Sequence, residues 1–261
     1  MKLSKLPVSV LINTLNAAST LKSAVDSVKH HVSQVVVVDM HSEDQTVDLA
    51  KKLGAQVYLH ARRTHVEPAR NFGLKKCSQP WILILDADEE VPDSLWPALE
   101  QIIKQQSVDV VKLPRLNFIW GKKIKHTGFW PDYNVRFFRA GKVQWQDQIH
   151  SQPLVSGRQH QLPPAEKYAL IHHHYKNLDQ FITRMLRYTQ VQAQELNQVG
   201  YQFSWQDLFN RPLAEFWRRF YFHQGWKDGV HGLALSGLQA VSELLVYLRL
   251  WEMQGLPAQT I

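Results

Sequence analysis

An unbroken apolar segment ends in a cluster of acids, and this is where chemistry is first expected. Trp81–Leu85 is followed directly by Asp86, Asp88, Glu89 and Glu90. Alternate residues of an extended chain point the same way, so Asp86 and Asp88 could reach one cation. Mg²⁺ and Mn²⁺ prefer oxygen ligands and commonly bridge carboxylates to substrate phosphates. The segment predicts a divalent-metal site for a diphosphate, although an acidic loop near the start of the next helix is the simpler alternative.

A second polar segment, residues 39–46, follows a run of four valines. Carboxylates in a loop between a strand and a helix commonly hold a base or a ribose. Asp39, at the tip of the strand, is the better binding candidate. Asp44 could instead cap the following helix.

The third segment is Glu67–Gly73, which contains Arg70 and Asn71. Arg70 can offer several N–H donors to a diphosphate, or it can fix an aspartate of the site. An ordinary surface ion pair is an equally simple interpretation of this arginine.

Strands and helices alternate in the part of the chain that must position these residues. Such alternation favours βαβ crossovers, a parallel sheet and a nucleotide site at the carboxyl ends of the strands. The predicted strands are 8–11, 35–38, 56–59 and 81–85, and the predicted helices are 19–31, 46–53 and 68–76.

The pattern changes after a further helix (94–106) and strand (108–113). Aromatic, basic and irregular sequence typical of short antiparallel strands and loops continues to Leu162, and helical spacing returns over 179–198 and 212–252. The stretch 229–251 is long enough to span a membrane. Because it contains Glu243 and Arg249, we expect an amphipathic helix that packs on the domain or lies in a membrane interface. The predicted domains are 1–175, which is catalytic, and 176–261, which is helical and faces the acceptor or the membrane.

Composition narrows the class of protein. With 261 residues and 44% hydrophobic content the chain can bury a full core, and its single cysteine, Cys77, excludes an internal disulfide and suggests a buried apolar residue. The N-terminal apolar run meets Asn13 and Asn16 without a cleavage site, so it predicts a first strand rather than a signal peptide. We therefore expect a cytoplasmic protein. The alternative is a protein attached peripherally to the inner face of the cytoplasmic membrane.

The net charge of +7 raises the possibility of a nucleic-acid partner. No helix-turn-helix, zinc-finger or RNA-binding signature accompanies it, so no nucleic acid is expected. The basic residues concentrate from Lys112 onward among aromatic residues, which also fits an anionic membrane surface or a phosphorylated lipid.

Together the three polar segments resemble the family 2 inverting glycosyltransferases of the GT-A fold. The resemblance is good over residues 8–93. Four later segments resemble the branch that acts in lipopolysaccharide-core and cell-envelope assembly, and these are Tyr133–Arg139, Ile149-His150, His172–Tyr175 and Gly225–Gly232.

This resemblance implies an α/β fold, with a Rossmann-like, mostly parallel sheet flanked by helices and a mainly helical C-terminal region. It implies inverting, metal-assisted transfer of a sugar from a nucleotide-diphosphate-sugar donor to a hydroxyl of a glycan, glycolipid or envelope polysaccharide. The cofactor would be Mn²⁺ or Mg²⁺. The residues that match the family's donor and metal positions are Thr14, Asn16, Asp39, Asp44, Thr46, Arg70, Asn71, Asp86 and Asp88, of which Asp86 and Asp88 form the metal-binding Asp-x-Asp.

Two positions depart from the family pattern. His41 replaces a usual Ser, and Ser151 stands where related sequences often have Glu after the His matched by His150. If that Glu is the usual general base, this chain needs another. We rank Asp147 above His150 and Asp132, because it lies in a basic, aromatic acceptor region.

Trp120 and Trp130 are the candidates for stacking on an acceptor sugar, with closure of a hydrophobic cluster as the alternative. One of the adjacent histidines 172–174 could complete the metal shell. The preferred alternative is that they cap the helix from Asp179 and pack or hydrogen-bond near the site. Competing functions are a nucleotidyltransferase, a donor-binding protein without transfer and a nucleic-acid-binding protein. The first lacks the expected Gly-rich loop after the first strand.

Overall fold

A computed structural model describes residues 5–62, 66–146 and 153–255 of the chain. The chain divides into two compact units. The first, called here the sheet unit, contains Met1–Leu116 and Pro131–His173, and the second, the helical unit, contains Asn117–Trp130 and His174–Ile261.

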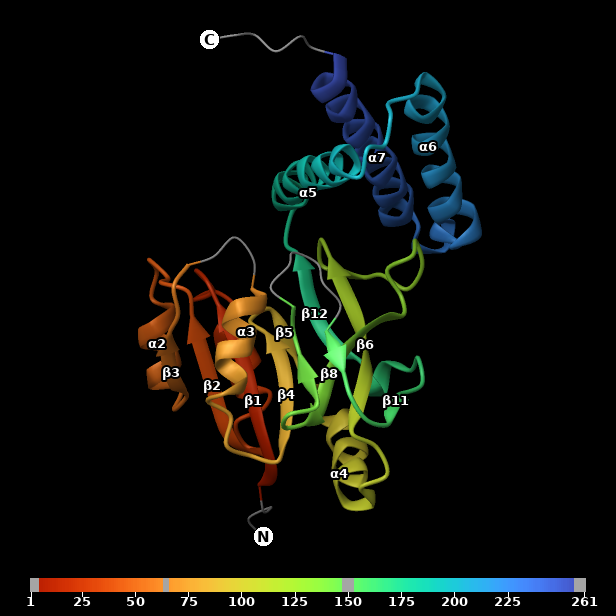
Figure 1. Ribbon diagram of the computed structural model, residues 1–261. Coiled ribbons are helices and arrows are strands. Elements are labelled where there is room, and N and C mark those ends of the chain that lie inside the picture. The colour runs from red at the N-terminus through yellow and green to blue at the C-terminus, as the bar shows by residue number, and fades with distance from the viewer. Residues whose placement is uncertain (1–4, 63–65, 147–152, 256–261) are drawn as a thin grey trace. The chain divides into compact units, whose positions relative to one another are not determined.

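The first four long strands of the sheet unit are parallel and lie in the order β3-β2-β1-β4 (Figure 1). Their bounds are β1 Leu6–Thr14, β2 Val32–Asp39, β3 Gln56–Leu59 and β4 Trp81–Asp86. The helices between them are α1 Leu21–Asp26, α2 Thr46–Lys52 and α3 Glu67–Leu74. This alternation is the predicted one, although α1 is shorter than the helix expected over 19–31.

The remaining strands make the sheet mixed. β8 pairs antiparallel with both β4 and β6, and β12 pairs antiparallel with β5, in the order β4-β8-β6-β12-β5. The bounds are β5 Glu89–Glu90, β6 Val110–Ile119, β8 Asp132–Arg139, β9 Val143–Gln144, β10 Leu154–Val155, β11 Gln159–Gln161 and β12 Leu170–Tyr175. A 3₁₀ turn (Asp93–Leu95) precedes α4 (Trp96–Gln105), and a second one covers Glu166–Tyr168.

The parallel register brings the polar ends of three strands together. Asn13 lies beside Asp86, and Thr14 lies opposite Asp39. Alternation places Asn13 and Asp86 on the face where Leu11 and Ile84 pack against α3, and Thr14 and Asp39 on the opposite face. A ligand at this edge of the sheet could therefore meet polar groups from both faces.

Cys77 packs against the apolar cluster on the α3 face. Burial raises the pKa of its thiol to about 12, so the group is protonated at neutral pH. This agrees with its interpretation as an apolar residue rather than a nucleophile.

In the helical unit, α7 packs against both α5 and α6 (Figure 1). The helices are α5 Leu178–Gln198, α6 Trp205–Trp217 and α7 Val230–Gly255, with a π-helical turn at Arg218–Phe222 and a 3₁₀ turn at Gly225–Asp228. The helical pattern expected over 212–252 is thus interrupted between α6 and α7. By length and composition α7 could cross a membrane, and 28% of its most apolar window is buried.

The segment Asn117–Trp130 belongs to the helical unit because Asp228 holds it there. The Asp228 carboxylate accepts hydrogen bonds from the His126 backbone N–H at 3.0 Å and the Thr127 hydroxyl at 2.9 Å. Lys122, in the short strand β7 (Lys122–Lys123), donates to the Asp228 carbonyl at 2.7 Å. The predicted domain boundary at residue 175 had assigned this segment to the catalytic domain, because hydrogen bonds between distant segments leave no mark in local sequence.

Two glycines in α7 give a matched test of this packing. A methyl group on Gly232 would lie 1.7 Å from the backbone oxygen of Gly225, whereas one on Gly237 would meet nothing within 4 Å. We expect Gly232→Ala to lower the free energy of unfolding by at least about 2 kcal/mol, because backbone has to move. Gly237→Ala should raise it by about 0.5–1 kcal/mol through helix propensity.

Urea titration followed by circular dichroism measures both variants. Equal effects of the two substitutions would show that the Gly225–Gly232 contact does not hold the turn against α7.

Candidate active site

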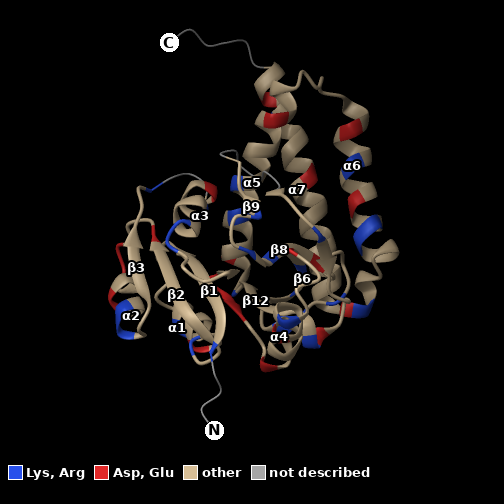
Figure 2. Ribbon diagram, turned by 60° about the horizontal axis from the view of Figure 1, so that its bottom comes forward, with Lys and Arg blue, Asp and Glu red and all other residues tan. Residues whose placement is uncertain are grey.

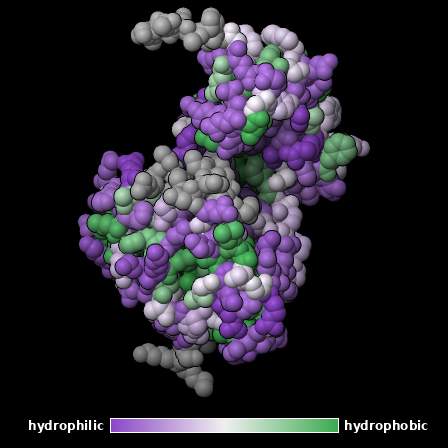
Figure 3. Space-filling model, viewed as in Figure 1, coloured by the Kyte–Doolittle hydropathy of each residue, from purple (hydrophilic) through white to green (hydrophobic). Residues whose placement is uncertain are grey.

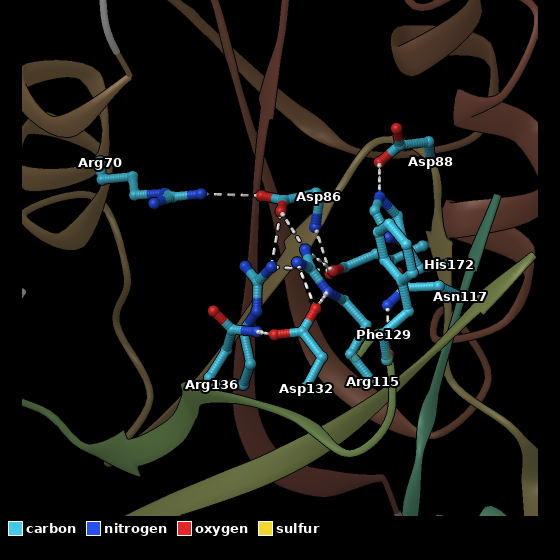
Figure 4. Close-up of polar contacts among 11 residues, drawn as sticks. Arg70, Asp86, Asp88, Arg115, Asn117, Phe129, Asp132, Arg136 and His172 are labelled. Carbon is cyan, nitrogen blue, oxygen red and sulfur yellow. Dashed lines mark hydrogen bonds and ion pairs between the residues drawn. The ribbon is translucent and has the colours of Figure 1, made fainter. Parts of the chain in front are cut away.

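Asp86, at the end of β4, is held by arginines from two other elements (Figure 4). Arg70 of α3 donates to Oδ1 at 2.9 Å, and Arg136 of β8 donates to Oδ2 at 2.5 Å. Arg115 of β6 lies 3.9 Å from Oδ2. Both carboxylate oxygens are therefore engaged by guanidinium groups.

Glu89 forms the second centre of this ion cluster and is fully buried. Its Oε1 accepts from Arg136 at 2.8 Å and lies 3.3 Å from Arg115, while its Oε2 accepts the Asp86 backbone N–H at 2.9 Å. Arg115 also donates from Nε to Asp132 at 2.7 Å. Three carboxylates thus face three guanidinium groups, a balance that buried charges require.

The pKa of the Asp86 carboxyl follows from this arrangement. Burial would raise it, but the charges of Arg136, Arg70 and Arg115 outweigh burial and hold the pKa well below its ordinary value. For Arg136, burial is likewise outweighed by Asp86 and Glu89, which raise its pKa. Asp86 is therefore an anion at neutral pH and acts as an anchor for arginines. Its predicted role as a metal ligand stays a prediction.

Asp88 lies beyond the ion cluster and faces a different partner. Its Oδ1 is 3.6 Å from Nε2 of His172, which is buried on β12. His173 points to the other side of the strand, with Nε2 2.9 Å from Glu90. A carboxylate and an imidazole are both suitable ligands for Mn²⁺, so Asp88 and His172 could hold a cation together.

Within the described ranges no group of three or more His, Cys, Asp or Glu residues is arranged to hold a metal ion. A cation held by Asp88 and His172 would need further ligands from water or from substrate phosphates, as Mg²⁺ commonly has. The other predicted role of the histidines, capping the next helix, is wrong. The side chain of Asn177 caps α5 by accepting the Gln180 backbone N–H at 2.9 Å.

Asp39, at the end of β2, is fully buried. Its carboxylate accepts from the Thr14 hydroxyl at 2.8 Å and from the backbone N–H and hydroxyl of Ser42 at 2.8 and 2.6 Å. These contacts join the ends of β1 and β2.

Asp44 and Asn16 fasten the same two loops from the outside. The Asp44 carboxylate accepts from the backbone N–H groups of Ala18 at 3.1 Å and Thr46 at 3.0 Å, and a hydrogen bond from the Thr46 hydroxyl is the main cause of its lowered pKa. Asn16 has a left-handed backbone, with φ of 51°, and accepts the Glu43 backbone N–H at 2.8 Å. Four of the predicted donor-site residues, Thr14, Asn16, Asp39 and Asp44, are thus brought together at one sheet edge.

Several buried polar atoms near α3 have no hydrogen-bond partner within the described part of the chain. They are both amide atoms of Asn13, Oε2 of Glu67 and Nε of Arg70. Unpaired buried polar groups are costly, so this face suits a polar ligand. Asn13 and Glu67 were not among the predicted site residues. The only signal for Asn13 was its position at the end of a strand.

Asn71 acts on the main chain of Trp145. Its Nδ2 donates to the Trp145 carbonyl at 2.7 Å, and its Oδ1 accepts the Trp145 backbone N–H at 3.0 Å. The Arg70 guanidinium lies 5.6 Å from the centre of the Trp145 ring. Asn71 therefore fixes the chain just before residues 147–152, which fall outside the described residues and include the base candidates Asp147 and His150.

The other predicted residues have clear structural settings. Asp132, the third base candidate, pairs with Arg115 and accepts from Asn134 Nδ2 at 3.1 Å. Trp120 packs in a hydrophobic cluster of the helical unit, with ring centroids 5.8 Å from Phe181 and 5.9 Å from His231. Trp130 is half-buried in the same unit. Their acceptor role stays a prediction.

Asp86→Asn tests the ion cluster through its pH dependence. A depressed folded pKa means that the carboxylate stabilises the fold above its ordinary value of 3.8 and that this contribution is lost as pH falls through the folded pKa. We expect the variant to unfold about 3 kcal/mol more easily at pH 7, because it leaves buried arginines uncompensated. The difference from wild type should narrow below pH 3.8.

The measurement is urea unfolding between pH 7 and acid, with the exposed Asp48→Asn as control. A difference that does not change with pH would contradict the assigned role of Asp86.

Known proteins give an independent comparison. The family model of Glycosyl transferase family 2 matches residues 9–156. The lipopolysaccharide core biosynthesis glycosyltransferase LpsC of Rhizobium meliloti is 26% identical over 98% of this chain and 96% of its own length. An uncharacterized glycosyltransferase of Rickettsia felis is 26% identical over 94% and 89% of the two chains.

Among solved structures, residues 1–349 of S. aureus TarS in complex with UDP align with 97% of this chain and 93% of that one, with a TM-score of 0.49 and 15% identity. The predicted α/β GT-A fold with a helical C-terminal region is confirmed, with a sheet that is mixed. The match over residues 9–156 covers more than half of the sequence, and the chain therefore belongs to glycosyl transferase family 2.

Proposed function

We propose that this glycosyltransferase moves a sugar, with inversion, from a nucleotide-diphosphate-sugar donor to a hydroxyl of a glycolipid or envelope glycan. The observation that carries the proposal is the Asp88–His172 pair, 3.6 Å apart, next to an Asp86 whose oxygens are occupied by arginines. The arginines fix Asp86, whereas Asp88 faces the His172 imidazole. This arrangement suits a site that holds a cation and a phosphate ester.

The donor would lie along the carboxyl edge of the parallel strands. Thr14, Asn16, Asp39 and Asp44 would border the nucleoside, and Asn13 and Arg70 would offer their unpaired groups to the diphosphate. Asp88 and His172 would hold Mn²⁺ or Mg²⁺, with further ligands from the diphosphate. When bound, the cation would neutralise charge on the leaving diphosphate.

The chain's own residues would divide the remaining work. Asp86 and Glu89 would orient Arg70, Arg115 and Arg136 through ion pairs. The acceptor oxygen would form a bond to the anomeric carbon on the face opposite the diphosphate, whose bond to that carbon breaks and takes the electron pair. A base would accept the hydroxyl proton in the same step.

Asp147 is the proposed base. It follows Trp145, whose main chain is held by Asn71 through two hydrogen bonds. Asp132 is less suitable, because proton uptake there would leave Arg115 facing an uncharged acid. His150 is the next candidate, and Ser151 removes the carboxylate that related sequences often have at that point.

The acceptor is proposed as a glycolipid for two reasons. The relative LpsC is described as a lipopolysaccharide core biosynthesis enzyme and matches nearly the full chain. Trp120 and Trp130 lie in a segment that also contains Lys122, Lys123 and Lys125, a combination that suits a sugar with nearby anionic groups. A location on the inner face of the cytoplasmic membrane would bring the enzyme to such an acceptor.

Calorimetric titration of UDP, GDP and CDP, each with and without Mn²⁺, tests the donor and metal site. We expect one diphosphate to bind with metal dependence, and Asp88→Ala and His172→Ala to remove that dependence because each deletes a proposed ligand. His173→Ala is the matched control, because its side chain faces Glu90 instead.

If none of the three diphosphates binds, the proposed donor site is contradicted. Unchanged binding by Asp88→Ala together with steep salt dependence for DNA or RNA would favour a nucleic-acid-binding protein.

Asp147→Asn tests the base. With the donor identified by calorimetry and extracted core glycolipid as acceptor, we expect kcat to fall about 10²–10⁴-fold while donor affinity stays unchanged. The measurement is transfer of radiolabel to lipid, with Asp132→Asn assayed in parallel. A normal rate for Asp147→Asn with a large loss for Asp132→Asn would reverse the assignment. Donor binding by wild type without any transfer would favour the donor-binding alternative.

A further inference from the structure

The helix α6 carries a stripe of large exposed hydrophobic side chains. Its members occur at every fourth position, and each is at least half exposed. They are Trp205 (61%), Phe209 (67%), Leu213 (59%), Trp217 (50%) and Tyr221 (64%), and they are called here the α6 stripe. The stripe is about 24 Å long at the rise of an α-helix. Figure 3 shows a hydrophobic side chain projecting among hydrophilic neighbours at the edge where Figure 1 places α6.

In the described part of the chain, only the N-terminal end of the stripe touches α7, where the ring centroids of Trp205 and Trp251 are 6.3 Å apart. α6 packs through a different face, on which Leu208 is buried against Tyr247 and Leu250 of α7. Single exposed apolar residues are common on protein surfaces, but large ones that adjoin one another usually mark an interaction site.

Backbone geometry keeps the stripe continuous past the end of α6. In an α-helix every fourth residue moves about 40° around the axis, so such a stripe gradually drifts. The wider π-helical turn at Arg218–Phe222 slows that drift. The apolar surface then continues through Phe222 and Trp226, which are 74% and 53% exposed.

Charge and residue type indicate what covers this surface. The helical unit has eleven Lys and Arg residues against seven Asp and Glu. Arg211 of α6 pairs with Asp207, and Arg218 of the π-helical turn pairs with Glu215, so basic and acidic positions alternate along this segment (Figure 2). Exposed Lys227 follows. Trp and Tyr are favoured at the boundary between hydrocarbon and water, and basic side chains can reach lipid phosphates beside them. A second copy would bring the same excess of positive charge to the contact.

We infer that the α6 stripe docks the protein on an anionic lipid bilayer, with α6 lying in the plane of the membrane interface. The apolar side chains enter the headgroup boundary, and the exposed Lys227 meets the lipid phosphates. This deepens the proposed function, on which it rests for the lipid nature of the acceptor. It also assigns membrane contact to α6 rather than to the longer and more apolar α7, which packs on both neighbouring helices.

Sedimentation with vesicles tests the inference. The probes are vesicles of 30% phosphatidylglycerol in phosphatidylcholine, and of phosphatidylcholine alone, each mixed with full-length protein. We expect preferential binding to the anionic vesicles. The double variant Phe209→Ser with Trp217→Ser should bind anionic vesicles about 100-fold more weakly. Each lost side chain accounts for about tenfold, if half of it is buried in the bilayer. The matched control is Leu186→Ser with Val199→Ser, which removes exposed apolar residues of the same unit outside the stripe and should leave binding unchanged.

Three outcomes would overturn the inference. The first is that wild type does not bind vesicles, and the second is that the stripe variant binds them as well as wild type does. The third is that light scattering shows wild type and the control variant as dimers and the stripe variant as a monomer. Nucleoside-diphosphate titration of the same samples separates the two proposals. Normal diphosphate binding without vesicle binding would overturn the docking surface alone, whereas vesicle binding without diphosphate binding would contradict the donor site alone. Circular dichroism confirms that each variant is folded.

Discussion

Opposite charges buried at the end of β4 determine how the rest of the site is arranged. Arg136 is buried, and the carboxylates of Asp86 and Glu89 supply the opposite charge that a buried guanidinium requires. Asp86 and Glu89 are only three positions apart, at β4 and β5, but Arg136 comes from β8, 50 positions after Asp86, so this cluster also fixes the junction between the parallel and antiparallel halves of the sheet. Arg70 extends the cluster to α3 and Arg115 extends it to β6. The chemistry proposed for Asp88 depends on this rigid surrounding.

The cluster also explains which parts of the site could be predicted from sequence. The strand ends with Asp39 and Asp86, the Arg70-Asn71 pair and the alternation of strands and helices are local patterns, and each lies where it was expected. The partners of Asp86 are different, because Arg115 and Arg136 lie 29 and 50 positions further along the chain. Nothing local distinguishes them from other basic residues of the second half. An Asp-x-Asp pattern indicates two carboxylates but does not tell that arginines occupy the first of them.

The helical unit shows a similar limit. Helical spacing over its sequence predicted helices, but hydropathy drew attention to α7, the most apolar one. α7 contacts both α5 and α6, although only 28% of its most apolar window is buried. The unusual surface belongs to α6, whose apolar residues divide between a face that packs and a stripe that does not. Only tertiary contacts separate those two uses of the same residue types. The membership of Asn117–Trp130 in this unit, which depends on Asp228, was equally invisible in local sequence.

Asn71 holds Trp145 through the peptide group of that residue rather than through its side chain. The amide of an asparagine has the same donor and acceptor as a peptide, so the contact imitates one rung of a β-ladder. Such an attachment imposes no side-chain type on the residues that follow. The residues that follow Trp145 in the sequence can therefore be exchanged while the main chain at Trp145 stays attached to α3. Substitutions in that segment need no matching change in α3.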